Sequence, residues 1–155
     1  MDEISFVRVG LEVLETRPAS DIINVLLAPP CSISTRATET VWVATYNAAG
    51  RLHNVAMVAQ GGFDESHVQI PALMNVIALS GAERFLIAHN HPNGKPTPSP
   101  DDLALTQEVA DAADAIGYIL EDHLIFDSTR RYVSLAKSGW LTPRVPAVLR
   151  LGRSA

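Results

Sequence analysis

Two histidines and an aspartate near the middle of the chain have the types and spacing that bind divalent metals. His89 and His91 follow the apolar residues 85–88, a pattern that predicts the end of a β-strand. Side chains two positions apart in a strand point to the same face, so one ion can contact both imidazoles. Asp102 can add a carboxylate oxygen and leave the fourth position open. This is the arrangement of a catalytic zinc site, because a structural zinc has protein ligands in all four positions.

A second interpretation of Asp102 needs no metal. Ser99, Pro100, Asp101 and Asp102 follow each other in the order typical of a helix start, with a serine N-cap, proline in the first position and acids in the first turn. Ser99 and Asp102 also have the spacing of a capping box. A helix that starts after the Pro/Gly-rich loop can equally return Asp102 to the strand end. On the residues alone, both interpretations stay open.

A hydrolytic zinc site also needs a carboxylate that is close to the metal but not bound to it. Bound zinc lowers the pKa of water to about 7 and polarises a substrate carbonyl. The free carboxylate takes the proton of that water and passes it to the leaving amine. Glu39 is the candidate, because it opens an apolar strand that we place in the same sheet. A solvated glutamate at a strand edge is the alternative.

The rest of the chain mixes strand and helix patterns that could position these side chains. Strands are predicted at residues 7–13, 39–46, 52–60, 118–126 and 131–136, besides the one that bears the histidines. Helices are predicted between Pro18 and Pro29, over residues 71–80 and over residues 100–116. The turn at residues 47–50 favours an antiparallel hairpin. We therefore expect an α/β fold with a mixed, curved β-sheet flanked by helices.

Length and charge indicate one domain without a nucleic-acid surface. A chain of 155 residues with 47% hydrophobic content can bury one core, which we place at residues 1–136. The net charge of -5 does not favour DNA as a partner, because DNA binding needs clustered Lys and Arg. Residues 137–155 carry basic residues and no acid. This basic C-terminal tail is a loose chain end or a docking arm.

The chain has features of a cytoplasmic protein. Cys31 is the single cysteine, so the chain can form neither an internal disulfide nor a cysteine-based zinc knuckle. Acids replace the basic residues of a secretory signal at the N-terminus, and no apolar run is long enough to cross a bilayer. We expect a cytoplasmic location and no membrane partner. The sequence does not indicate an oligomeric state.

The histidine motif resembles a known family signature. His89-x-His91, then seven residues, then Ser99-x-x-Asp102 resembles the signature of the JAMM (MPN+) metalloproteases. The sequence His-Asn-His-Pro-x-Gly, followed by Pro-x-Pro-Ser, resembles that of the bacterial RadC branch. Glu39 sits where that family has its catalytic glutamate. Two further stretches, at residues 105–106 and 122–125, match the RadC pattern, and the resemblance covers roughly residues 4–136.

The resemblance implies a fold and an activity. The fold is the RadC-like JAMM/MPN domain, with a layering like that of cytidine deaminases. His89, His91 and Asp102 are the implied Zn²⁺ ligands, Glu39 the implied general acid/base, and Ser99 an implied donor to the oxyanion. The implied function is a zinc-dependent metallohydrolase, a peptidase or isopeptidase that cleaves an amide bond in a peptide or protein conjugate.

Some positions depart from the family pattern or stay ambiguous. RadC proteins usually have a Pro-Arg pair where this chain has Ile70-Pro71, and commonly an acid at the position of Lys95. Asp122 or His123 could orient a metal ligand by a hydrogen bond without binding the metal itself, but adjacent strand residues face opposite ways. At most one of these two can point at the site. His53 and His67 have no partners at ligand spacing, and we expect structural or solvated roles.

Other function classes are less well supported by the sequence. The adjacent letters His-Asn-His do not form the motif of an HNH nuclease, whose residues are separated by long intervals. The cysteine ligands of a zinc nucleobase deaminase are absent. A JAMM-like binding module without turnover is a third class. The main alternative to a peptidase is a DNA-repair or mobile-element accessory protein, which the historical name of the RadC branch suggests.

Overall fold

The structure is a computed structural model, and it describes residues 21–61 and 69–144. The predicted strand at residues 7–13 and the end of the basic tail lie outside the described residues. The helices are α2 (Ile22–Leu27), the short 3₁₀ helix η2 (Ile33–Thr35), α3 (Ile70–Ser80) and α4 (Pro100–Ile116), and the strands are β1 (Thr40–Tyr46), β2 (Leu52–Gln60), β3 (Arg84–His91), β4 (Ile119–Asp127) and β5 (Tyr132–Ser134).

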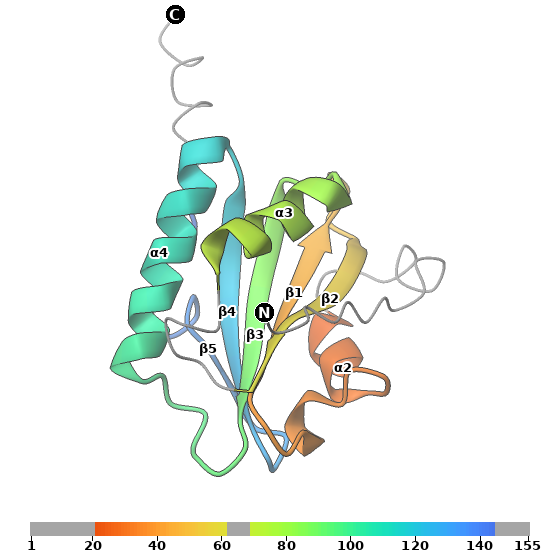
Figure 1. The fold of residues 1–155 in the computed structure, drawn as a ribbon, viewed down its shortest axis with the longest axis vertical. Coiled ribbons are helices and arrows are strands. Elements are labelled where there is room, and N and C mark those ends of the chain that lie inside the picture. The colour runs from red at the N-terminus through yellow and green to blue at the C-terminus, as the bar shows by residue number, and fades with distance from the viewer. Residues whose placement is uncertain (1–20, 62–68, 145–155) are drawn as a thin grey trace, which may run out of the picture.

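The strands form one five-stranded mixed sheet in the order β2-β1-β3-β4-β5. β1 and β2 form the predicted antiparallel hairpin, and β1 also pairs antiparallel with β3. β3 and β4 are parallel, whereas β5 returns antiparallel to β4. A parallel pair needs a crossover connection, and α4 supplies it. The predicted mixed sheet flanked by helices is therefore confirmed (Figure 1).

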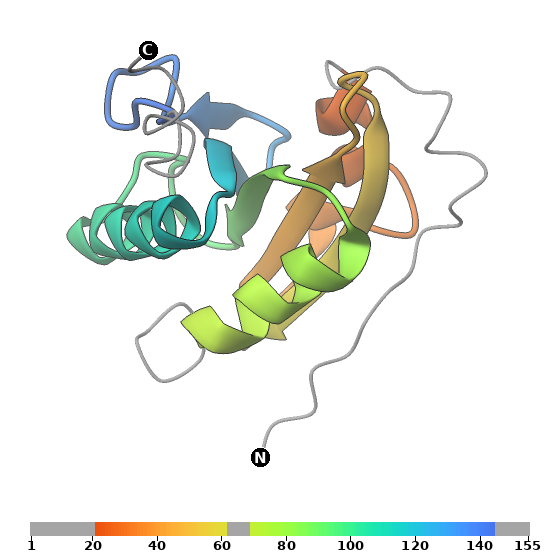
Figure 2. The same cartoon turned by 90° about the horizontal axis from the view of Figure 1, so that it is seen from above.

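Helices cover both faces of this sheet. Figure 2 shows α3 and α4 on one side and α2 on the other. One hydrophobic cluster joins Val41, Val43, Phe85 and Ile87 to α3 and α4, and a second joins the intervening strand residues to α2. Burial on both faces explains why these strands are almost continuously apolar. His89 continues the row of Phe85 and Ile87, so it points to the side of α3 and α4.

The predicted element boundaries that fall within the described residues are close to those observed, with one shortened strand. Helix α4 has the predicted bounds and ends at Gly117, whose φ of 89° is the left-handed conformation that glycine adopts easily. The last strand was predicted at residues 131–136 but ends at Ser134. There the Asp122 carboxylate accepts hydrogen bonds from the Ser134 hydroxyl and the Ala136 amide, which turns the chain out of the sheet.

The start of the predicted basic tail packs back on the domain. Leu141 is buried with the core of the α4 face, and Arg144 forms an ion pair with Asp111 of α4 at 2.8 Å. The domain boundary at residue 136 stays a prediction.

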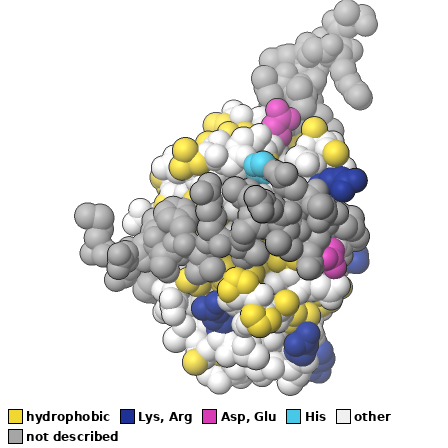
Figure 3. All heavy atoms as spheres, turned by 90° about the vertical axis from the view of Figure 1, so that its right-hand side faces the viewer, with side chains coloured by type: hydrophobic (Ala, Val, Ile, Leu, Met, Phe, Trp, Pro, Cys, Tyr) yellow, Lys and Arg dark blue, Asp and Glu magenta, His cyan; other side chains and the backbone are white. Residues whose placement is uncertain are grey.

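One face of the molecule, the right-hand side of Figure 1, mixes side-chain types. Lys and Arg side chains stand there at separate places among hydrophobic, acidic and neutral ones (Figure 3). Within residues 21–61 and 69–144, no helix combines the length and the hydropathy that a membrane crossing requires.

Candidate metal centre

The end of β3 and the first turn of α4 bring the three predicted ligands together. His89 is fully buried, whereas His91, two residues further along the strand, is partly exposed at the rim. Asp102 is buried in the first turn of α4. Within the described part of the chain, these three residues are the single group of His, Cys, Asp or Glu whose ligand atoms lie close enough to hold a metal, all within 4.8 Å of one another.

Asp102 is at once a helix cap and a partner of both histidines. Its backbone amide donates to Ser99 Oγ at 3.1 Å, and its Oδ2 accepts from the Ser99 amide at 2.7 Å, which completes the capping box. The same carboxylate places Oδ1 3.2 Å from His89 Nε2 and Oδ2 3.2 Å from His91 Nε2. The two interpretations that the sequence left open are therefore compatible, and the cap orients the carboxylate.

The spacing of the three side chains fits a tetrahedral metal. The Nε2 atoms of His89 and His91 are 2.9 Å apart, and each lies 3.2 Å from a carboxylate oxygen of Asp102. Ligands at ordinary zinc distances in a tetrahedron are separated by about 3.3 Å. His91 Nδ1 donates to the backbone carbonyl of Lys95 at 2.7 Å, because a carbonyl can only accept. A neutral His91 ring consequently presents its Nε2 lone pair to the cluster.

The electrostatics favour the metal-binding forms of Asp102 and His89, whereas His91 retains its proton to higher pH. Burial alone would raise the pKa of Asp102, but the neighbouring His89 and His91 rings outweigh it and hold that pKa far below its usual range. Burial lowers the pKa of His89, so this ring is neutral at pH 7. The hydrogen bond to Asp102 raises the pKa of the more exposed His91. An anionic carboxylate and neutral imidazoles are the forms that bind metals.

An open cavity of about 570 Å³ joins the cluster to the two other predicted site residues. Its lining includes Glu39, His91, Ser99 and Asp102. Burial is the main influence on the pKa of His89 and lowers it, and the hydrogen bond to Asp102 is the main influence on the pKa of His91 and raises it, so the charge of Glu39 has only a minor effect on either ring. The Ser99 hydroxyl accepts the Asp102 amide and keeps its own hydrogen for another acceptor. The structure thus brings all five predicted side chains to one place.

Asn90, between the two histidines, fastens the segment that carries Glu39. Its Oδ1 accepts from the Thr40 amide and the Thr40 hydroxyl, both at 2.8 Å, and its Nδ2 donates to the Thr38 carbonyl at 3.0 Å. The Gly61 amide donates to the carbonyl of Glu39 itself at 2.9 Å. The backbone on both sides of Glu39 is therefore held at the end of β3. Sequence reasoning missed this role of Asn90.

The structure also places the residues whose roles the sequence left ambiguous. His123 points at the site, with its Nε2 2.8 Å from His89 Nδ1, whereas Asp122 bonds to β5 on the other face. At most one of the two was predicted to face the site, and His123 does so. Lys95 contributes its carbonyl to the site, and its side chain is exposed. Sequence reasoning assigned no role to Thr106, which contacts His123 from α4.

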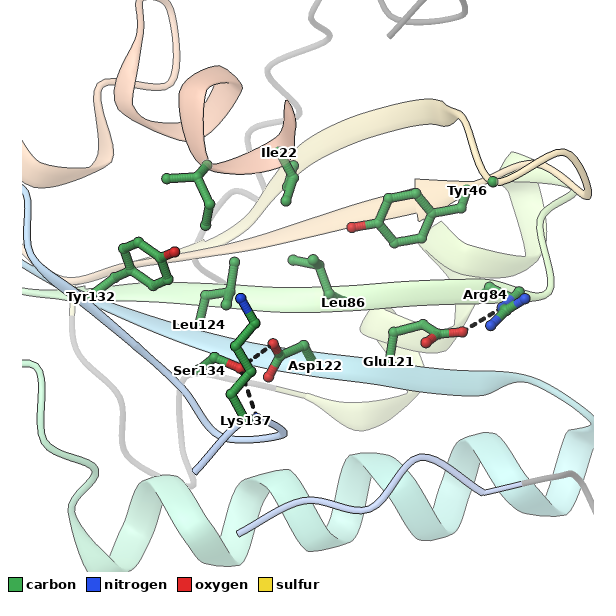
Figure 4. A pocket seen from close by; sticks show the side chains of 12 residues that line it. Ile22, Tyr46, Arg84, Leu86, Glu121, Asp122, Leu124, Tyr132, Ser134 and Lys137 are labelled. Carbon is green, nitrogen blue, oxygen red and sulfur yellow. Dashed lines mark hydrogen bonds and ion pairs between the residues drawn. The ribbon is translucent and has the colours of Figure 1, made fainter. Parts of the chain in front are cut away.

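A second cavity, of about 440 Å³, lies on the α2 face of the sheet (Figure 4). Its charged lining is largely paired internally, since Arg84 pairs with Glu121 and the Asp122 carboxylate bonds to Ser134. The lining contains no histidine or cysteine. The chemistry of this cavity therefore differs from that of the cluster at the end of β3.

Comparison with known proteins agrees with this geometry. Residues 18–140 match the family described as the RadC-like JAB domain. The chain belongs to this family. A UPF0758 protein of Porphyromonas gingivalis is 35% identical over 103 residues, which cover 66% of this chain and 45% of that protein. One of Acaryochloris marina is 31% identical over 144 residues, covering 85% and 58%. The RadC-like JAB chain thus spans about half the length of the curated relatives it matches.

Proposed function

We propose that this RadC-like JAB domain is a zinc-dependent metallohydrolase, a peptidase or isopeptidase that cleaves an amide bond. The observation that carries the proposal is the convergence of His89 Nε2, His91 Nε2 and the Asp102 carboxylate on one point at the edge of an open cavity. Family membership supports the metallohydrolase class. Two nitrogens and one oxygen leave one tetrahedral position for water, as in catalytic zinc sites.

The residues around the cavity have the chemistry for amide hydrolysis. When bound to His89, His91 and Asp102, zinc would supply an acidified water and polarise the scissile carbonyl. Glu39 faces the same cavity without belonging to the cluster, so it can accept a proton and deliver it to the leaving amine. Ser99 can donate its hydroxyl hydrogen to the oxygen of the substrate carbonyl as negative charge develops there.

The substrate we propose is a peptide or a protein conjugate. The cavity is open, so an extended chain can lie across it. A proton donor beside the metal is suited to an amine leaving group, which must be protonated to depart. The cytoplasmic location expected from the sequence stays a prediction.

The test compares wild type with Glu39→Gln, using zinc analysis and a survey of peptides and ubiquitin-like conjugates as substrates. We expect about one zinc per chain in both proteins, because Glu39 is not a ligand. Amide cleavage should fall by about 10²–10⁴-fold in Glu39→Gln, as for loss of a general acid/base. Glu108→Gln, on the exposed surface of α4, is the matched control and should cleave normally. Cleavage by Glu39→Gln at the wild-type rate would contradict the proposal.

The alternative function, a DNA-repair or mobile-element accessory protein, has a different signature. DNA binding with a steep salt dependence, unchanged by Glu39→Gln, would favour it. The net charge of -5 does not favour DNA as a partner, because DNA binding needs clustered Lys and Arg.

A further inference from the structure

A buried chain of hydrogen bonds lies behind the metal-binding cluster. His89 Nδ1 is 2.8 Å from His123 Nε2, and His123 Nδ1 is 2.6 Å from Thr106 Oγ1. The Thr106 hydroxyl lies 2.6 Å from the backbone carbonyl of Asp102. His89 and His123 are 0% exposed and Thr106 is 3% exposed, so bulk water does not compete for these contacts. The chain thus begins at one candidate ligand and ends on the backbone of another.

The donor and acceptor of each hydrogen bond in this chain follow from the group at its end, the Asp102 carbonyl. The Asp102 carbonyl can only accept, so the single hydroxyl hydrogen of Thr106 points to it. Thr106 Oγ1 must then accept from His123 Nδ1–H. A fully buried imidazole is neutral, so its Nε2 has no hydrogen and accepts from His89 Nδ1–H. His89 is left with an unprotonated Nε2, the atom that faces His91 and Asp102.

We propose that Thr106 and His123 are positioning residues that hold His89 in the tautomer able to bind metal. The proposal rests on the metal site of the proposed function but not on amide cleavage. His91 obtains the same tautomer from the carbonyl of Lys95 at the exposed rim. His89 is too deep for such a loop contact, and it uses a side-chain relay instead. The acceptor behind a ligating histidine sets both its tautomer and its ring orientation.

The fold explains why His123 can take this role. In the parallel pair of β3 and β4, His123 is in register with Ile87, and His89 is the next residue on the same face. The irregularity between Phe85 and Leu86 of β3 inserts Glu121 into β4 as an extra residue. After this irregularity His123 faces α4, while Asp122 faces β5. Thr106 is one turn beyond Asp102 in α4, so it meets His123 from the helix side.

The test compares Thr106→Val, which keeps the shape but removes the hydroxyl, with Thr106→Ser, which keeps the hydroxyl. Long-range ¹H–¹⁵N correlation of the imidazole nitrogens in metal-free protein reports which nitrogen of His89 carries the hydrogen. Zinc affinity is measured by competition with a chromophoric chelator. We expect wild type and Thr106→Ser to have an unprotonated Nε2 and similar affinities. Thr106→Val should populate the other tautomer and bind zinc about 10–100-fold more weakly.

A second pair of variants covers the case in which Thr106→Val does not fold, as judged by circular dichroism. His123→Gln keeps an acceptor for His89 Nδ1–H, whereas His123→Leu removes it. The glutamine variant should bind zinc more tightly than the leucine variant by about 10-fold or more.

Several outcomes would overturn the proposal. These are a hydrogen on His89 Nε2 in wild type, a Thr106→Val protein with wild-type tautomer whatever its affinity, or equal zinc affinities of the His123 pair. A wild type with the expected tautomer and tight zinc binding, but without amide cleavage on any substrate, would contradict the proposed function alone.

Discussion

At the scale of single residues, Asp102 combines two roles that are usually separate. A carboxylate offers about four lone-pair sites, so one group can cap a helix and still face two imidazoles. The capping contact with Ser99 fixes the side chain in the orientation that the histidines need. The carboxylate is buried and lies 3.2 Å from the Nε2 atom of each ring. Position 102 is therefore sensitive to the loss of charge even where shape is retained.

Asp102→Asn should separate the two roles. An amide oxygen can still accept from the Ser99 amide, so helix α4 should form normally by circular dichroism. The neutral side chain is a poor ligand, and zinc affinity should fall by more than about 100-fold, which exceeds the effect of losing an outer partner. Asp101→Asn changes the exposed neighbour in the same turn and should leave zinc affinity unchanged. Equal zinc binding by both variants would show that Asp102 is only a cap.

At the scale of elements, the site is the junction of a strand end with a helix start. β3 delivers two imidazoles to one face, and the loop after it returns the first turn of α4 to the same point. Asn90 ties the start of β1 to the end of β3, so that Glu39 is carried to the rim. Hydrogen bonds between the backbone and the side chains of Asn90 and Ser99 hold these elements next to the functional side chains. The site is therefore positioned by contacts within and between secondary-structure elements.

Substitutions of Ser99 test this junction, because Ser99 both begins α4 and faces the cavity. Ser99→Ala removes the cap and should lower the free energy of unfolding by about 1 kcal/mol in urea denaturation. Ser99→Asn restores an N-cap acceptor and should restore most of that stability. Both variants lack the hydroxyl, and each should lose about 10²–10³-fold in kcat if Ser99 donates to the oxyanion. Wild-type kcat in the asparagine variant would limit Ser99 to capping.

At the scale of the whole molecule, metal binding should be coupled to folding and to pH. A ligand that binds the folded chain adds about 4 kcal/mol of stability at a free concentration 1,000-fold above its Kd. The thermal midpoint should therefore rise with zinc and fall on chelation, in calorimetry or circular dichroism. The Asp102→Asn variant should show little of this response.

The pH dependence of that stabilisation has a definite sign. The hydrogen bond to Asp102 raises the pKa of His91, so in metal-free protein His91 keeps its proton to higher pH than an ordinary histidine. Zinc needs the neutral ring, and below the raised pKa it must displace that proton. The zinc-induced rise in Tm should consequently shrink as the pH falls through this pKa. A zinc effect that grows in acid would contradict this assignment of His91.

The local features of the site could be predicted from the sequence because they depend on short-range geometry. The pleat places His89 and His91 on one face, and the sequence from Ser99 to Asp102 encodes a helix cap. The turn after β1 encodes the hairpin. The single shortened strand was missed because Asp122 captures an amide fourteen positions away, and periodicity does not report such contacts.

The amino-acid sequence by itself determined the ligand types, their spacing along the chain and the elements that bear them. Only the tertiary structure decided which residues distant in the sequence contact these ligands or line the cavity next to them. His123 and Thr106 reach His89 because β4 lies parallel to β3 beneath α4, and an inserted residue in β4 turns His123 to that face. Glu39 reaches the cavity because Asn90 binds a segment some fifty positions away. Contacts of this range depend on how the sheet is ordered, which no local pattern encodes.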